Sequence, residues 1–163
     1  MTAAPSSILQ ALYRGDRAEA ERLHGEAADL DVFEAAALGD GERLRAVLEE
    51  DPGVAQAWSP DGFTALHYAA FFDGPDAVRI LVEVGAELEA PATNEEFAPG
   101  AHPLHSAIAA RRADTALALL EAGADPNARQ HGGFTPLMEA EQLGDLELAE
   151  ILIRHGAVAG GGA

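Results

Sequence analysis

Histidine is the residue type in this sequence with the clearest capacity for chemistry near neutral pH, because imidazole can exchange a proton or bind a metal. His102 and His105 are three residues apart and could meet on one face of a helix, and Glu95 and Glu96 precede them closely. Two imidazoles and a carboxylate would suit a metal ion that keeps open coordination positions. The spacing is common, however, and the two acids lie on a flexible segment. We therefore expect no metal site here.

Other catalytic signatures are missing from the sequence. It contains no cysteine, which excludes disulfides, thiolate metal sites and cysteine nucleophiles. No glycine-rich phosphate loop follows a strand, and no G-x-S-x-G segment is present. Paired carboxylates carry no information in a chain with 28 acidic residues. We expect a protein that is not an enzyme and that has no catalytic residue, no metal and no cofactor.

The charge of the chain limits its partners. It has 28 acidic residues against 10 arginines, no lysine, and a formal net charge of −18. Such a field repels nucleic acid and anionic lipid, so we exclude both as main partners. The acidity has two interpretations, a basic protein partner or the solubility of an alanine-rich chain, and the second is the stronger.

The sequence favours a cytoplasmic protein. No apolar stretch approaches the ~20 residues of a membrane-spanning helix, and the first residues lack the basic start and apolar run of a secretory signal. We expect a monomer without a membrane partner. The alanine-rich, lysine-free composition also suggests a GC-rich bacterial genome.

Three segments repeat one another and must position whatever site exists. They are TALHYAAFFDGPDAVRILVEVGA from Thr64, HPLHSAIAARRADTALALLEAGA from His102 and TPLMEAEQLGDLELAEILIRHGA from Thr135. The motif leucines of the three segments are Leu66, Leu104 and Leu137, which are 38 and 33 residues apart. Each of them precedes the closing glycine of its segment by 19 residues. Such periods indicate a stacked architecture, since one short unit cannot bury its apolar faces alone.

Each segment predicts two short helices. The first begins at the opening threonine or histidine, where a hydroxyl can cap the helix in two of the three cases. It ends near Asp73, Arg111 or Gly144. The second carries apolar residues three and four apart and stops at the closing glycine, where we expect a left-handed cap.

Two looser units precede these segments. DVFEAAAL from Asp31 and SILQALYR from Ser7 each form a first helix, and each is followed by Gly-Asp and a second helix. The two glycines, Gly15 and Gly39, are only 24 residues apart, so the connection between these units must be abbreviated. At the other end of the chain, Glu139 and Glu141 predict a polar cap that closes the stack.

The TALH, PLH and TPLM openings, the Ala69-Ala70 pair and the endings VGAELEA and AGADPNA resemble ankyrin repeats. The resemblance covers about residues 5–157 and is most specific over 60–157. It implies an all-α ankyrin-repeat solenoid of stacked helix-turn-helix units, with β-hairpin or loop fingers along one edge. We expect a single domain, 1–163, with units at about 5–30, 31–59, 60–92, 100–130 and 131–157 and a flexible tail at 158–163. The sequence departs from the family at Asp73 and Arg111, where a turn glycine is usual, and at His102, which replaces the capping threonine.

The resemblance also implies roles for individual residues. His67 and His105 should form hydrogen bonds between turns. The concave surface should consist of the finger tips and the last turns of the first helices. Carried over to this sequence, those positions give these partner-binding residues: Tyr13, Asp61, Phe63, Phe71, Phe72, His131, Phe134 and Gln142. Large rings beside small residues are typical of binding hot spots.

Packing is the competing interpretation of these aromatic residues. For Phe63 and Phe134 packing and partner contact are equally supported, whereas for Phe71 and Phe72 partner contact is favoured. The five extra residues of the longer interval fall in APATNEEFAPG, an acidic loop whose Phe97 we add to the partner-binding residues. Insertions in solenoids often lie on the binding edge, although a plain surface loop explains this one equally well.

Two hypotheses follow for function. The first is a non-catalytic protein–protein interaction module, an adaptor or regulator that binds a partner on its concave aromatic face. The second is a small-molecule-binding protein or enzyme that uses the same groove with His67, His102, His105 or an acid. A deep closed pocket with a strongly shifted histidine would favour the second.

Overall fold

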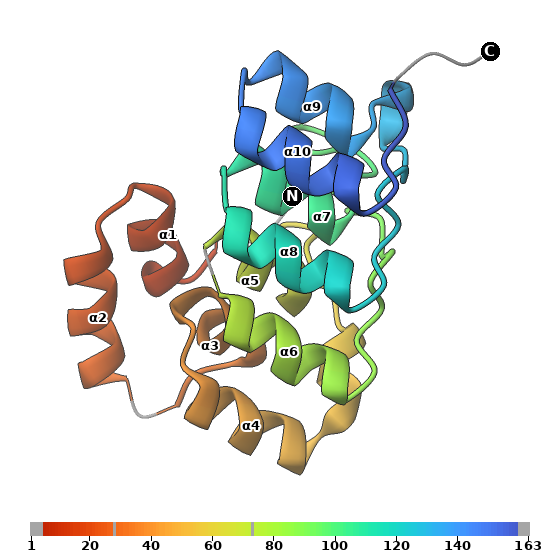
Figure 1. Cartoon of the computed structure of the whole chain (residues 1–163). Helices are drawn as coiled ribbons and strands as arrows, with labels where there is room; N and C mark the ends of the chain where they lie inside the picture. Colours follow the sequence, from red (N-terminus) through yellow and green to blue (C-terminus); the bar gives the residue numbers. More distant parts are fainter. Residues whose placement is uncertain (1–4, 28, 73, 160–163) are drawn as a thin grey trace.

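The computed structural model describes residues 5–27, 29–72 and 74–159, which form an all-α solenoid and confirm the predicted fold class. Its helices alternate between an inner and an outer row (Figure 1). The inner helices are α1 (Ser7–Tyr13), α3 (Val32–Leu38), α5 (Ala65–Phe71), α7 (Pro103–Ala109) and α9 (Pro136–Gln142). The outer helices are α2 (Arg17–Glu26), α4 (Gly41–Glu50), α6 (Pro75–Glu83), α8 (Ala113–Glu121) and α10 (Leu146–Arg154).

The helix pairs stack row by row. α3 packs against α5, α5 against α7 and α7 against α9, while α4, α6, α8 and α10 form the second row (Figure 1). Longer connections lead from α4, α6 and α8 to the next inner helix, and two of them contain the 3-10 turns η1 (Pro52–Gln56) and η2 (His131–Gly133). In the first of these fingers Trp58 and Thr64 form an isolated antiparallel bridge. None of the described helices has the length and apolar composition to cross a membrane.

Local sequence sets where the helices begin. Aspartate side chains accept a backbone N–H in the first turn of three outer helices, at Asp16, Asp40 and Asp145. Thr135 caps α9 in the predicted way, with 3.3 Å from Met138 N to its Oγ1. Thr64 differs, because its hydroxyl lies 2.8 Å from His67 Nδ1 and bonds to that ring instead.

Left-handed residues end the helices. The three closing glycines, Gly85, Gly123 and Gly156, have φ of 85°, 105° and 96°, which confirms the predicted stops. Arg111 occupies the turn between α7 and α8 with φ 57°, a conformation that strains a side chain with a Cβ by about 1–2 kcal/mol. Its Nη2 donates to Leu143 O at 2.8 Å, which ties this turn to the next unit. Asp73, the other departure, lies outside the described residues.

The core is continuous along the stack. Four leucines of the three repeated segments are at most 1% exposed: Leu66, Leu104, Leu119 and Leu137. Between them the inner helices carry fully buried alanines such as Ala69, Ala107 and Ala140, whose small side chains let neighbouring helices approach closely. Burial of one leucine stabilises the fold by about 1.5–3 kcal/mol relative to its exposure.

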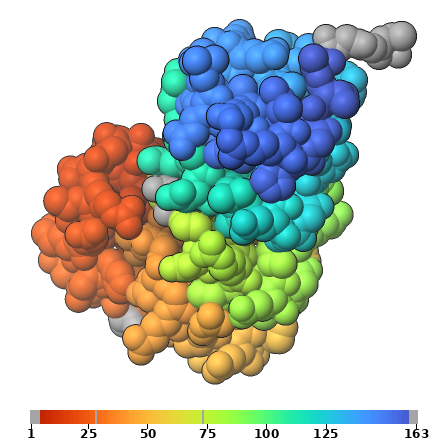
Figure 2. Space-filling view, viewed as in Figure 1, coloured from red at the N-terminus to blue at the C-terminus, as the bar shows by residue number. Residues whose placement is uncertain are grey.

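The N-terminal hairpin, which we define as α1 and α2, departs from this regular stacking. Only residues 27–31 separate α2 from α3, too few for a finger, and this confirms the predicted abbreviated connection. α1 packs against α3, but among the described residues α2 makes no comparable packing with α4. The hairpin therefore stands out to one side of the stack (Figures 1 and 2).

Candidate functional site

A hollow of about 960 Å³ lies on the side of the inner helices, and we call it the inner-face hollow. Its wall comes from α1, α5, α7 and α9, from the first finger and from the inserted loop 92–101. Residues from four of the five helix pairs or their connections therefore meet in one place. Five of the nine residues predicted to bind a partner line it: Tyr13, Asp61, Phe63, Phe71 and Phe97.

An aromatic cluster forms the end of the hollow that is nearest the N-terminal hairpin. The Tyr13 ring lies 6.3 Å from Phe71 and 5.3 Å from Phe72, and Phe71 meets Phe72 edge to face at 5.1 Å. Phe72 also stacks parallel to Tyr68 at 6.4 Å. Phe71 is 37% exposed, whereas Phe72 is 9% exposed because Tyr13 and Tyr68 pack against it. The surface expected from both phenylalanines thus comes from Phe71, and Phe72 supports it from below.

Asp61 is the polar centre of the first finger. Its Oδ1 accepts hydrogen bonds from the hydroxyls of Tyr68 and Ser59, and its Oδ2 accepts one from Tyr13 at 3.3 Å. Burial, reinforced by the Asp61 carboxylate, raises the pKa of both tyrosine hydroxyls, which therefore stay protonated and act as donors. Asp61 joins α1, α5 and the finger into one wall.

The inserted loop is bound to the first finger along its backbone. Thr93 N donates to Gly62 O at 3.0 Å, and Asn94 Nδ2 donates to Asp61 O at 2.8 Å. A Cβ at Gly62, where φ is 88°, would lie 2.7 Å from Asn94 N, so this close approach requires glycine. Asn94 Oδ1 in turn accepts the Phe97 N–H at 2.8 Å. The loop holds the 77% exposed Phe97 at the wall of the hollow.

Besides Phe72, three predicted residues lie outside the wall. His131 supports the inserted loop: its N–H donates to Pro99 O at 3.1 Å, and a Cβ at Gly100 would lie 2.6 Å from its ring. Phe134 is 39% exposed on the last finger, and Gln142 is exposed at the end of α9. These side chains do not join the others around the hollow.

His67 and His105 link adjacent units, as the family pattern implies. His67 Nδ1 accepts from the Thr64 N–H at 3.2 Å, so its Nε2 carries the proton and donates to Ala101 O at 2.9 Å. His105 repeats the arrangement with the His102 N–H and Phe134 O, both at 3.3 Å. Burial lowers the pKa of each ring to about 4, which keeps both neutral. The two rings have a structural role, because both nitrogens of each ring bond to the chain.

The metal constellation considered from the sequence does not form. His102 Nδ1 lies 2.7 Å from Glu89 Oε2, and His105 Nδ1 is bonded to the backbone. Glu95 lies on the side of His131, with 3.9 Å between its Oε2 and Nδ1 of that ring. Across the described chain, no group of three or more candidate ligands could hold a metal ion.

Glu139 is the residue of the hollow that sequence reasoning placed wrongly. We expected a solvent-facing cap at Glu139 and Glu141; Glu141 is exposed, but Glu139 is half-buried in the wall of the hollow. Its Oε2 is buried without a hydrogen-bond partner, and no other buried side-chain nitrogen or oxygen of the described residues is in that state. Burial raises the pKa of this carboxyl to about 7. The repeat contained one signal for this placement. Glu139 is the fourth residue of α9, and Tyr68, the fourth residue of α5, also lines the hollow.

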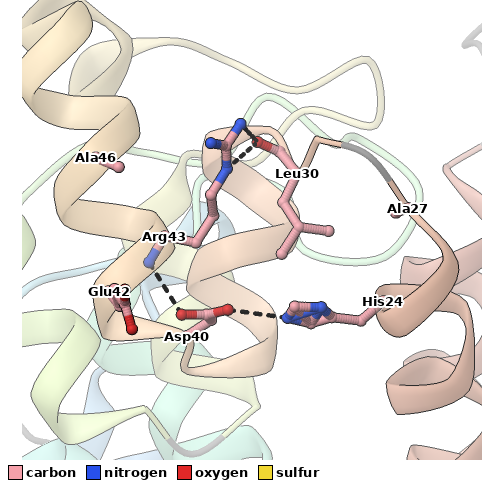
Figure 3. A pocket seen from close by; sticks show the side chains of 7 residues that line it. All are labelled: His24, Ala27, Leu30, Asp40, Glu42, Arg43 and Ala46. Atoms are coloured by element: carbon pink, nitrogen blue, oxygen red, sulfur yellow. Dashed lines mark hydrogen bonds and ion pairs between the residues drawn. The ribbon is translucent and has the colours of Figure 1, made fainter.

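A smaller pocket of about 340 Å³ lies between α2 and α4 (Figure 3). Asp40 accepts the Arg43 N–H at 3.0 Å and the His24 Nε2–H at 2.9 Å. The Arg43 guanidinium donates to Leu30 O at 3.2 Å and to Asp29 at 2.9 Å. Since these groups bond to one another, the pocket marks the seam between the hairpin and the stack.

Comparison with known proteins points to one family. A family model of ankyrin repeats in three copies matches residues 32–130, and a second model of ankyrin repeats in many copies matches 104–157. Neurogenic locus notch homolog protein 4 of Homo sapiens is 35% identical over 123 residues, 75% of this chain and 6% of that protein. Ankyrin repeat, SAM and basic leucine zipper domain-containing protein 1 of Ornithorhynchus anatinus is 32% identical over 141 residues, 83% of this chain and 28% of the relative. B-cell lymphoma 3 protein homolog of Mus musculus is 34% identical over 100 residues, which are 61% of this chain and 21% of that protein. The chain thus matches less than a third of the length of each relative.

Proposed function

Because the chain belongs to the ankyrin-repeat family, we propose that it is a non-catalytic interaction module that holds a segment of a partner protein in the inner-face hollow. As an adaptor or regulator it would act by presenting or sequestering that segment. One observation carries the proposal: three partly exposed rings from separate parts of the chain, Tyr13, Phe71 and Phe97, line the same hollow.

The construction of the hollow supports binding. Exposed aromatic rings that border a depression provide large apolar contact area at low conformational cost, which is typical of hot spots. The Asp61 hydrogen bonds fix the finger against Tyr13 and Tyr68, and Asn94 fixes the inserted loop. A preorganised wall of this kind loses little conformational entropy when a partner binds.

A small apolar molecule is the second candidate occupant, favoured by the volume of the hollow. About 960 Å³ falls within the range of small-ligand sites, roughly 300–1,000 Å³. The histidines do not favour an enzyme. The ring Nε2 atoms of His67 and His105 form hydrogen bonds to the next unit and are not free to exchange a proton with a substrate. A partner segment is preferred, since the wall extends from α1 to α9 and takes its exposed rings from α1, α5 and the inserted loop.

Two phenylalanines of nearly equal exposure provide a matched test. Phe71 lines the hollow and is 37% exposed, whereas Phe134 lies outside it and is 39% exposed. A partner captured from the native host should bind Phe71→Ala at least about 30-fold more weakly, a loss of about 2 kcal/mol, while Phe134→Ala changes affinity by less than about threefold. Calorimetric titration of purified partner against the variants measures both.

Phe72→Ala separates loss of binding from loss of packing, when its free energy of unfolding is measured beside its affinity. Since Phe72 is 9% exposed, we expect it to lower the free energy of unfolding by about 3 kcal/mol, more than Phe71→Ala does. Equal loss of affinity in Phe71→Ala and Phe134→Ala would remove the hollow from the functional account.

A further inference from the structure

One carboxylate oxygen of Glu139 has no hydrogen-bond partner, and this is the feature of the hollow that packing does not explain. A buried polar atom normally has a hydrogen-bond partner, because burial without one forfeits the hydrogen bonds that water would make to it. Glu139 Oε2 has none, although the side chain reaches the wall of the hollow. Groups with raised pKa in a concave site are candidates for ligand contact. Glu139 is in this position.

The Glu139 carboxylate lies at one end of a row of side chains whose character changes from aromatic to acidic. Tyr68, Ser106 and Glu139 are each the fourth residue of their inner helix, in α5, α7 and α9, and all three line the hollow. The hollow therefore changes from aromatic beside α5, where Phe71 and Tyr13 lie, to small beside α7 and acidic beside α9. An occupant that spans the row meets rings at one end and a carboxylate at the other.

The remaining charges around the hollow leave Glu139 without a counterion. No arginine lines it, and its other titratable groups are the acids Asp61, Glu95 and Glu96, the tyrosines 13 and 68, and the neutral histidines 67 and 105. Asp61 is already occupied by three hydroxyl donors. Glu95 and Glu96 are exposed on the inserted loop, so Glu139 is the half-buried carboxylate of the wall that a cation from outside would satisfy.

We propose that Glu139 receives the ammonium or guanidinium group of a lysine or arginine in the bound partner segment, while an apolar side chain of the same segment packs against Phe71 and Tyr13. This inference rests on the proposed function and names the chemistry of its partner. A hydrogen bond between two charged groups in a partly buried site is among the stronger ones in proteins. A cation close to the exposed face of an aromatic ring is attracted to it, so the rings of the hollow are compatible with a basic residue in the segment.

A random peptide library provides a probe that does not depend on the natural partner. Twelve-residue peptides are selected on the full chain, and we expect the enriched sequences to share one apolar residue and one lysine or arginine at a fixed spacing. The best peptide is then synthesised with its basic residue and with norleucine in that place, which keeps the aliphatic stem and removes the charge. Both peptides are titrated against the wild type, Glu139→Gln and the matched control Glu141→Gln, whose carboxylate is exposed.

The expected result is a coupling between the two charges. Replacement of the basic residue by norleucine should weaken binding at least tenfold in the wild type and in Glu141→Gln, and less than twofold in Glu139→Gln. Because burial raises the pKa of Glu139 to about 7, binding of the basic peptide by the wild type should also strengthen roughly tenfold between pH 6 and pH 8. Glu139→Gln should lose that dependence.

Other outcomes separate this inference from the proposed function. Peptides that need Phe71 but show no coupling to Glu139 overturn the inference and leave the binding function standing. Spermidine that displaces the peptide and binds as tightly would identify a small amine as the occupant, and this also overturns it. A library that yields no peptide sensitive to Phe71→Ala overturns both.

Discussion

The N-terminal hairpin and the central stack of α5–α10 are built from the same helix-pair motif, but they are fixed to the molecule in different ways. In the stack each inner helix packs on the next, each outer helix packs on the next, and His67 and His105 join successive units. The hairpin is attached through the packing of α1 on α3, through the Tyr13 ring, and through two polar contacts of α2. Those contacts are Arg17 Nη2 to Leu38 O at 3.0 Å and His24 to Asp40 at 2.9 Å.

The difference follows from the missing finger. With residues 27–31 as the whole connection, α2 cannot reach the position over α4 that the later outer helices occupy over one another. In a repeat protein stability is close to a sum of unit and interface contributions, so a unit with one weak interface opens first. The hairpin nevertheless supplies Tyr13 to the wall of the hollow, and Pro5, just before α1, also lines it. Part of the candidate site therefore belongs to the least fixed unit.

Leu104→Ala should have the largest effect, because Leu104 lies in the middle of the continuous core and is 1% exposed. We expect the free energy of unfolding, measured with urea, to fall by about 2–5 kcal/mol. The matched change in the hairpin is Leu9→Ala, at a residue 4% exposed in α1. Hydrogen exchange should show that Leu9→Ala lowers protection mainly in α1 and α2. If the two variants lower the stability of the stack equally, the hairpin is as firmly integrated as the central units.

A fall in pH should weaken the links of the stack. The pKa of His67 and of His105 is about 4 when folded and near 6.5 when unfolded, so the unfolded chain binds more protons between these values. Each histidine should therefore cost up to about 2 kcal/mol of stability between pH 7 and pH 5. Glu139 acts in the opposite direction, since its folded pKa of about 7 exceeds its ordinary value of 4.5 and its protonation stabilises the fold as the pH falls.

Glu139→Gln removes that opposing contribution and exposes the effect of the histidines. Urea unfolding of Glu139→Gln at pH 7 and pH 5 should show the full loss, and the further change His67→Gln should reduce the difference by about half. Equal stability of Glu139→Gln at the two pH values would show that the buried histidines do not control the acid response of the stack.

Tyr13→Ala should loosen the hairpin while leaving the stack intact. It removes a ring that packs on Phe71 and Phe72 and a hydroxyl that donates to Asp61. Because Tyr13 is 45% exposed, we expect a loss of about 1–2 kcal/mol in the protection of α1 against hydrogen exchange. Tyr13→Phe keeps the ring and should lose less than half as much. Unchanged protection of α1 in Tyr13→Ala would mean that its packing on α3 alone holds the hairpin.

His24→Ala should have the smallest effect. The His24–Asp40 pair at the seam is partly exposed, with 36% and 26% of the two side chains accessible, and such pairs contribute about 0–1 kcal/mol. We expect a change of less than about 0.5 kcal/mol in the protection of α2. A loss above 1 kcal/mol would identify the seam of Figure 3 as a specific interface between hairpin and stack.

Much of the fold could be predicted from local pattern alone. The periods of leucine and glycine placed the helix pairs, and the spacing of Gly15 and Gly39 predicted the abbreviated connection. Arg111 adopts φ 57° at the turn position that the repeat assigned to it. These features depend on residues within one or two turns of each other and on a repeated unit, so periodicity is sufficient to find them.

The candidate site was predictable only in part. Tyr13, Phe71 and Phe97 were identified as surface residues and do line one hollow, whereas His131, Phe134 and Gln142 came from equivalent positions and lie outside it. Equivalence in the repeat says which face a residue occupies but not which neighbours converge on it. That depends on where the hairpin and the inserted loop are placed, and neither repeats.

The sequence by itself thus determined the solenoid and its motif leucines, because short-range spacing and stacking of like units dictate them, and its resemblance to ankyrin repeats implied the structural role of His67 and His105. The tertiary structure alone decided the burial of Phe72 under Tyr13, a contact between residues 59 positions apart. It also decided that Glu139, an apparent surface charge on a terminal unit, faces a shared hollow without a partner. Both depend on how separate units curve toward one another, and the physical reason is that burial and pairing are set by the whole packed assembly rather than by the pattern of any one repeat.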